Sequence, residues 1–130
     1  MDHPQLTHFF PTPSELAGRD PGRIGMPAKR VATIQALARA VATEDLSFVV
    51  NASLENFIQR LTRIPGVGDW TAQYIAMRAL GEPDAFPAAD LGIARALQVG
   101  DKRPTPRQIL KRAENWRPWR AYAAIYLWHT

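Results

Sequence analysis

The chain has 130 residues, a length typical of a single domain, and 46% of them are hydrophobic, enough to build a buried core. Its 16 Lys and Arg outnumber 12 Asp and Glu, and it has no cysteine, which excludes disulfides, thiolate metal sites and cysteine nucleophiles. No stretch is long and apolar enough for a membrane-spanning helix, and the first residues carry no secretion signal. We therefore expect a soluble, cytoplasmic protein with no membrane partner.

The positive charge is concentrated near the C-terminus. Of the formal net charge of +4, residues 102–120 contribute +6 and the rest of the chain −2. The charged residues of this stretch are Lys102, Arg103, Arg107, Lys111, Arg112, Glu114, Arg117 and Arg120. A polyanionic partner such as nucleic acid would explain the stretch, and so would a solvated helix face.

The first 27 residues are rich in proline and glycine, which predicts an irregular segment with at most a short helical turn at 14–18. Residues 28–130 are predicted to form one helical domain. Its first three helices are expected at 29–43, from a Ser53 cap to about Leu61, and at 70–80 before Gly81. The second and third helices, with the turn between them, span 54–81.

Three more helices are expected in the C-terminal half. Asp90 can cap a short helix that reaches about Leu97. Thr105 and Gln108 form a capping-box pattern around Pro106, which predicts a helix to about Trp116, and Pro118 is expected to open the last helix. No alternation typical of strands competes with these assignments, so the predicted fold class is all-α, with about six helices.

The turn between the second and third helices has the sequence Pro65-Gly66-Val67-Gly68. Glycine permits positive φ and close backbone approach, and the free N–H groups of the next helix suit a phosphate. We predict a DNA-phosphate site at Gly66, Gly68 and the Thr71 hydroxyl. An ordinary tight connection between two helices is the alternative.

The segment Phe86-Pro87-Ala88-Ala89-Asp90 ends twenty residues after Trp70, and here the sequence resembles the helix-hairpin-helix (HhH-GPD) DNA glycosylase superfamily. It is most similar to the bacterial 3-methyladenine DNA glycosylase II, or AlkA-like, branch. The resemblance covers about residues 9–130. Further matching segments are Phe10-Pro11-Thr12-Pro13, Gly25-Met26-Pro27-Ala28-Lys29-Arg30 and Trp116-Arg117-Pro118-Trp119-Arg120-Ala121-Tyr122.

The resemblance implies a catalytic carboxylate at Asp90 and a base pocket lined by Trp70, Tyr74 and Trp128. A carboxylate stabilises the positive charge that develops on the sugar when an N-glycosidic bond breaks. An alkylated purine is itself cationic and is attracted to aromatic ring faces. From the residues alone, Asp90 could instead serve only as a helix cap, and the three aromatic side chains could belong to the core.

The resemblance also implies the reaction and its partners. The substrate is double-stranded DNA containing alkylated bases, and the damaged nucleotide is flipped out of the duplex. Relatives that also cut the strand carry a Schiff-base lysine where this chain has Trp70, so we expect a monofunctional enzyme of base excision repair. No cofactor is required, although backbone carbonyls of Thr62, Ile64 and Val67 can hold a structural Na⁺ or K⁺.

Two features depart from the family pattern. The segment 20–26 is shorter, so a helical turn is expected to be lost there. The chain also begins late relative to the family, which predicts an N-terminally incomplete glycosylase domain whose missing helices belong to an upstream region or to a partner chain. The alternative function is a non-catalytic helix-hairpin-helix DNA-binding fragment. Either would be associated with the bacterial nucleoid.

Overall fold

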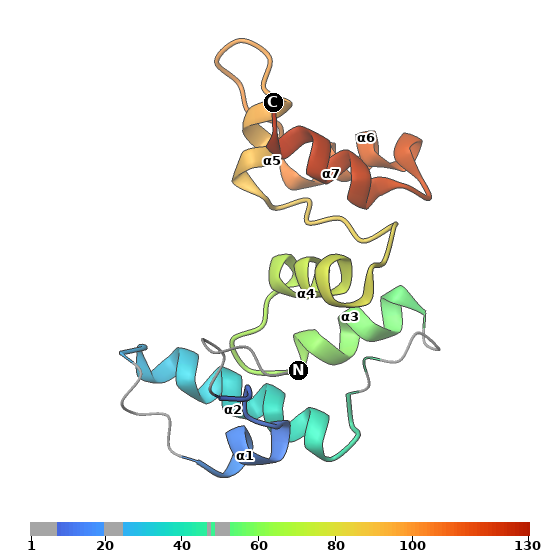
Figure 1. Cartoon of the computed structure of the whole chain (residues 1–130). Coiled ribbons are helices and arrows are strands. Elements are labelled where there is room, and N and C mark those ends of the chain that lie inside the picture. The colour runs from blue at the N-terminus through green and yellow to red at the C-terminus, as the bar shows by residue number, and fades with distance from the viewer. Residues whose placement is uncertain (1–7, 20–24, 47, 49–52) are drawn as a thin grey trace. The chain divides into compact units, whose positions relative to one another are not determined.

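The computed structural model describes residues 8–19, 25–46, 48 and 53–130 (Figure 1). Within these residues every regular element is a helix, and the only β pairing is an isolated bridge between Val99 and Lys102. The all-α prediction is therefore confirmed. Residues 1–7 and 20–24 lie outside the described residues, and with them most of the segment where a lost helical turn was expected.

The chain divides into two compact units, which are described separately. The first consists of Met1–Ser47 with Ile64–Gly66, and the second of Phe48–Arg63 with Val67–Thr130. The predicted division into an irregular segment 1–27 and a domain 28–130 stays a prediction.

The first unit contains α1 (Pro13–Gly18) packed on α2 (Ala28–Ala42). α1 begins at a capping box in which Thr12 and Glu15 satisfy each other's backbone N–H groups. The turn residue Pro65 belongs to this unit because the Thr33 hydroxyl on α2 donates a hydrogen bond to its carbonyl at 2.9 Å. The predicted helices at 14–18 and 29–43 are thus confirmed to within a residue.

The second unit begins with the two helices expected within 54–81. α3 (Leu54–Thr62) starts where the Ser53 hydroxyl accepts a hydrogen bond from the Asn56 amide, as predicted. It packs on α4 (Asp69–Ile75), which continues as a π-helix, η1 (Ala76–Leu80). Gly81 ends η1 in the left-handed region, with φ of 68°.

The rest of the second unit is built from α5 (Leu91–Ala96), α6 (Pro106–Ala113), the 3₁₀ helix η2 (Glu114–Trp116) and α7 (Arg120–Trp128). The predicted capping box of Thr105 and Gln108 is present. The buried core that joins these helices consists of Phe86, Ala88, Ile93, Ala94, Leu97, Ile109, Ala113 and Ala124.

The prediction that Pro118 opens the last helix is wrong. The Trp119 amide donates a hydrogen bond to the Trp116 carbonyl at 2.7 Å, which closes a turn around Pro118. Trp119, with φ of −113° and ψ of 28°, then precedes the first helical residue, Arg120. The proline therefore lies inside the turn rather than in the first turn of the helix.

An ion-pair cluster fastens the start of α7 to the loop after η1. The Arg120 guanidinium, whose side chain is only 9% exposed, donates from Nε to Asp84 Oδ1 at 2.7 Å. Arg117 pairs with both Asp84 and Glu114. Two of the seven basic residues of the 102–120 stretch therefore hold the fold together and are not simply a solvated face.

The described helices include none that is both long enough and apolar enough to cross a membrane.

Candidate functional site

Asp90 lies at the point where three elements of the second unit meet. Its carboxylate Oδ1 accepts a hydrogen bond from the Ile93 amide at 3.0 Å, so Asp90 caps α5 as the sequence predicts. The same oxygen accepts from the Trp128 indole N–H on α7 at 2.9 Å, and Oδ2 accepts from the Trp70 indole N–H on α4 at 2.7 Å. A residue that served only as a cap would need the first of these contacts and not the other two.

The loop that leads to Asp90 is held from both sides. The Gln73 side chain on α4 accepts a hydrogen bond from the Phe86 amide at 3.0 Å. On the other side, the Ala121 amide at the start of α7 donates to the Pro83 carbonyl at 2.9 Å. These contacts fix Asp90 between the helices that carry the two tryptophans.

The three predicted pocket aromatics are brought together around Asp90. Trp70 stacks on Tyr74 with ring centroids 5.2 Å apart and planes 10° from parallel, and Tyr74 lies 6.1 Å from Trp128. They line an open recess of about 410 Å³ with the carboxylate among its walls. Trp70 is 38% exposed, so it is not a core residue, whereas Trp128 packs against the buried core while also lining the recess.

Three residues of this recess were not found by sequence reasoning. They are Arg78, Ile125 and His129. Arg78 follows Tyr74 by four residues and Trp70 by eight, a helical spacing that could have identified it. Ile125 lies one turn before His129, whose Nδ1 is 2.8 Å from the Ile125 carbonyl oxygen, and no motif distinguishes that pair.

The π-helix η1 affects which side chains of the 70–80 helix face the recess. Regular α-helical spacing would place Met77 on the same side as Trp70 and Tyr74, but Met77 is 6% exposed and does not line the recess, whereas Arg78 does. The reason is the change from α4 to the π-helix at Ala76, because a π-turn holds more residues than an α-turn and shifts every later side chain around the axis.

The electrostatics of the site favour a charged carboxylate. Partial burial raises the pKa of Asp90, but the hydrogen bonds that the carboxylate accepts together outweigh burial and hold its pKa below the ordinary value. The donors, in falling order of effect, are the Ile93 amide, the Trp128 and Trp70 indoles and the Gly92 amide. Asp90 is therefore suited to act as an anion rather than as a proton donor.

A carboxyl NMR titration should show this directly. We expect the Asp90 midpoint below the ordinary aspartate value of about 3.9, and a higher midpoint in Trp70→Phe, which loses one donor. Because the folded-state pKa lies below the unfolded one, the Asp90 contribution to stability is present above the unfolded pKa and is lost as the pH falls through the folded pKa. A midpoint unchanged by Trp70→Phe would mean that the indole does not stabilise the charge.

The residues of the predicted phosphate site fall in both units. Gly66, in the first unit, has φ of 90°, as a glycine turn predicts. Gly68, in the second unit, has φ of −91° and caps α4 with no side chain, and Thr71 is half-buried in the first turn of that helix. A Cβ added to Gly68 would meet no atom within 4 Å, so the space directly beside this residue is open.

The two glycines should differ in their effect on stability. A Cβ at Gly66 would lie 2.1 Å from Thr33 Oγ1, the atom that holds Pro65, and would be strained at positive φ. We expect Gly66→Ala to lower the free energy of unfolding by roughly 1–3 kcal/mol. The matched variant Gly68→Ala has an allowed φ and free space, so it should cost below about 1 kcal/mol. Urea unfolding measures both, and equal losses would contradict this assignment.

The predicted cation ligands are the backbone carbonyls of Thr62, Ile64 and Val67. Thr62 ends α3, and the side chains of Ile64 and Val67 are buried. In the described part of the chain none of the three carbonyl oxygens accepts a hydrogen bond outside the helices, so all three are available as oxygen ligands. Ile64 belongs to the first unit and the other two to the second, and the cation site stays a prediction.

Comparison with known proteins identifies relatives of this arrangement. No family model matches the chain. It is 42% identical over 128 residues to the "probable bifunctional transcriptional activator/DNA repair enzyme AlkA" of Mycobacterium tuberculosis, covering 98% of this chain and 26% of that protein. It is 37% identical to DNA-3-methyladenine glycosylase 2 of Escherichia coli, covering 93% of this chain and 43% of that protein.

Solved structures show the same similarity in three dimensions. The chain matches the Schizosaccharomyces pombe 3-methyladenine DNA glycosylase Mag1 in complex with abasic DNA, with a TM-score of 0.77 and 31% identity, over 92% of this chain and 62% of Mag1. It matches a DNA-3-methyladenine glycosidase of Bacillus halodurans with a TM-score of 0.78 and 25% identity, over 92% and 59% of the two chains.

The chain thus spans between about a quarter and three fifths of the length of these relatives. Sequence and structural similarity cover almost all of the chain. Over that part of their length, the chain belongs to the helix-hairpin-helix DNA glycosylases, in the AlkA-like branch of 3-methyladenine DNA glycosylases.

Proposed function

We propose that this chain carries the catalytic centre of a DNA N-glycosylase that releases alkylated purines from duplex DNA. The single observation that carries the proposal is the Asp90 carboxylate, held by the indole N–H groups of Trp70 and Trp128 in the wall of an open aromatic recess. The relatives named for this reaction support the choice of substrate.

The chemistry follows from the charge on Asp90. As the N-glycosidic bond breaks, positive charge develops on the deoxyribose, and an ionised carboxylate fixed nearby stabilises that charge. The Asp90 carboxylate is oriented by three donors before any substrate arrives, so little reorganisation is needed. The same carboxylate can orient the water that attacks the sugar.

The aromatic walls suit a cationic base. The stacked pair of Trp70 and Tyr74 and the ring of Trp128 offer electron-rich faces to a purine that alkylation has made positive. Such a base is already a good leaving group, which fits a recess in which Asp90 is the one carboxylate among the described lining residues. To reach the recess, the nucleotide must leave the base stack.

The rest of the DNA contact is assigned to the hairpin. The free amides at the start of α4, with Gly68 and Thr71, suit a backbone phosphate and would bind duplexes without reading their sequence. Gly66 shapes the turn. A Na⁺ or K⁺ held by the carbonyls of Thr62, Ile64 and Val67 would add a positive charge facing the DNA.

Base release should occur without cleavage of the strand. Trp70 stands where a lysine would be needed for a Schiff base with the sugar, and an indole cannot form one. We expect borohydride to trap no covalent protein–DNA adduct under conditions where a control lyase is trapped. If borohydride trapped an adduct with the parent but not with a variant of the recess, the monofunctional assignment would be wrong.

Alkali sensitivity tests the proposed reaction in the same samples. A methylated, end-labelled duplex treated with the chain should break at purines only after mild alkali, because glycosylases leave abasic sites. If the chain bound the duplex but produced no alkali-sensitive sites, it would be a DNA-binding fragment and the proposal would be wrong.

A further inference from the structure

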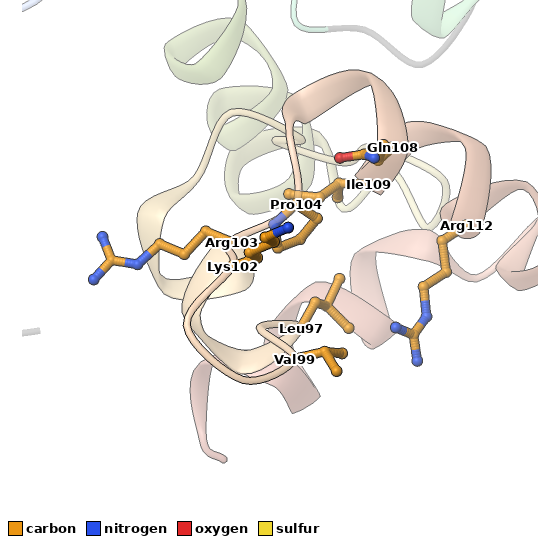
Figure 2. A pocket seen from close by; sticks show the side chains of 8 residues that line it. All are labelled: Leu97, Val99, Lys102, Arg103, Pro104, Gln108, Ile109 and Arg112. Carbon is orange, nitrogen blue, oxygen red and sulfur yellow. The ribbon is translucent and has the colours of Figure 1, made fainter.

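A second pocket lies at the opposite end of α5 from Asp90 (Figure 2). Its volume is about 530 Å³. Asp90 caps the start of α5 and Leu97, a lining residue of this pocket, follows its last residue, so the two sites are separated by about 9 Å of helix. The two pockets share no lining residue, and occupying one need not block the other.

The rim of this pocket is positively charged. Arg103 and Arg112 extend from opposite sides of it, and Lys102 lies on the loop between α5 and α6 (Figure 2). Neither Lys102 nor Arg112 has an ion-pair partner among the residues that the structure describes, and Arg103 donates only to the neutral Gln98 amide at 3.2 Å. The three charges are available to an external anionic group.

The floor of the pocket is apolar. Leu97 and Ile109 belong to the buried core, and Pro104 is drawn between them (Figure 2). Val99 stands at the edge and is 79% exposed, which leaves an apolar side chain unpacked. The Val99–Lys102 bridge and the left-handed Gly100, with φ of 59°, shape the loop that presents it.

We propose that this pocket docks an acidic peptide segment of a partner protein, with one apolar side chain seated on the floor and carboxylates paired with the rim. Charge complementarity selects an anionic partner, and the apolar floor selects one that carries an apolar anchor. A DNA backbone would use the cations and leave the exposed Val99 side chain without an apolar counterpart. The proposal does not depend on the reaction assigned to Asp90.

Fluorescence anisotropy at low salt tests this docking with the full chain. The probe is a short synthetic peptide in which glutamates flank a single phenylalanine, compared with the same peptide carrying serine instead. The parent protein should bind the phenylalanine peptide more tightly than the serine peptide. Lys102→Glu with Arg112→Glu should weaken that binding by about tenfold or more. Val99→Ser should remove the preference for phenylalanine.

Arg107→Glu with Lys111→Glu is the matched control, since it makes the same charge change on α6 outside the pocket. It should change the affinity by no more than about threefold. The proposal would be overturned if both double variants lost the same affinity for the peptide. It would also be overturned if the parent showed no preference for the phenylalanine peptide, or if Val99→Ser left that preference unchanged. If only the Lys102→Glu, Arg112→Glu variant lost affinity for undamaged duplex, the rim would be a DNA contact and the proposal would be wrong. All these positions are exposed, and thermal unfolding would confirm that each variant is folded.

Discussion

Asp90→Asn is expected to lower the single-turnover rate of base release by about 10²–10³, while affinity for undamaged duplex stays close to that of the parent. The substitution keeps the size of the side chain and removes the negative charge that opposes the developing cation. The duplex contacts assigned to the hairpin involve Gly68 and Thr71 on another helix, so they are not disturbed. A variant that releases base at nearly the parental rate would remove Asp90 from the catalytic role.

The hydrogen bonds of Asp90 call for a second variant. An asparagine oxygen can keep the donors Ile93 and Trp128, but its NH₂ group would face the Trp70 indole N–H, another donor. Asp90→Asn can therefore lose stability as well as charge. Trp70→Phe removes that donor, so we expect the double variant to be as stable as Trp70→Phe alone and still inactive. If the double variant were active, the lower rate of base release in Asp90→Asn would come from the misplaced donor and not from the missing charge.

Asp84→Ala should have the largest effect on stability, a loss of about 3–5 kcal/mol in the free energy of unfolding. The reason is the Arg120 guanidinium, which is 9% exposed and would lose the carboxylate that accepts both of its hydrogen bonds. Such a loss is a large part of the roughly 5–15 kcal/mol that holds a small domain folded. Urea unfolding followed by circular dichroism measures it.

Glu114→Gln is the matched control for Asp84→Ala. Glu114 belongs to the same ion-pair cluster, but its side chain is 54% exposed and its pairs with Arg117 and Arg120 are screened by water. We expect a loss within about 1 kcal/mol. If Asp84→Ala proved no more costly than Glu114→Gln, the cluster would not be what fastens α7 to the loop before Asp90.

Local signals in the sequence were enough to predict most helix ends. Ser53, Asp90 and the Thr105 capping box each start a helix where they were expected, because a cap depends only on residues within one turn. Pro118 shows the limit of this rule. A proline suits the first turn of a helix and a tight turn equally well, and the Trp119 to Trp116 hydrogen bond that decides between them is not encoded in spacing.

The residues that meet at Asp90 could be named from the sequence, but their hydrogen bonds could not. The resemblance marked Asp90, Trp70, Tyr74 and Trp128, and the structure brings all four together. The two indole hydrogen bonds link residues 20 and 38 positions apart, a tertiary arrangement that no local pattern encodes. The π-helix after Ile75 likewise departs from the α-helical spacing that would place Met77 beside Trp70 and Tyr74.

Identification of the base released from a methylated duplex tests the central claim most directly. The chain should liberate free alkylated purine, detected by mass spectrometry, and no unmodified base from an untreated duplex of the same sequence. We expect Asp90→Asn, bound to the same duplex, to release base at least about a hundredfold more slowly than the parent. A folded chain that binds methylated DNA and leaves every base attached would contradict it.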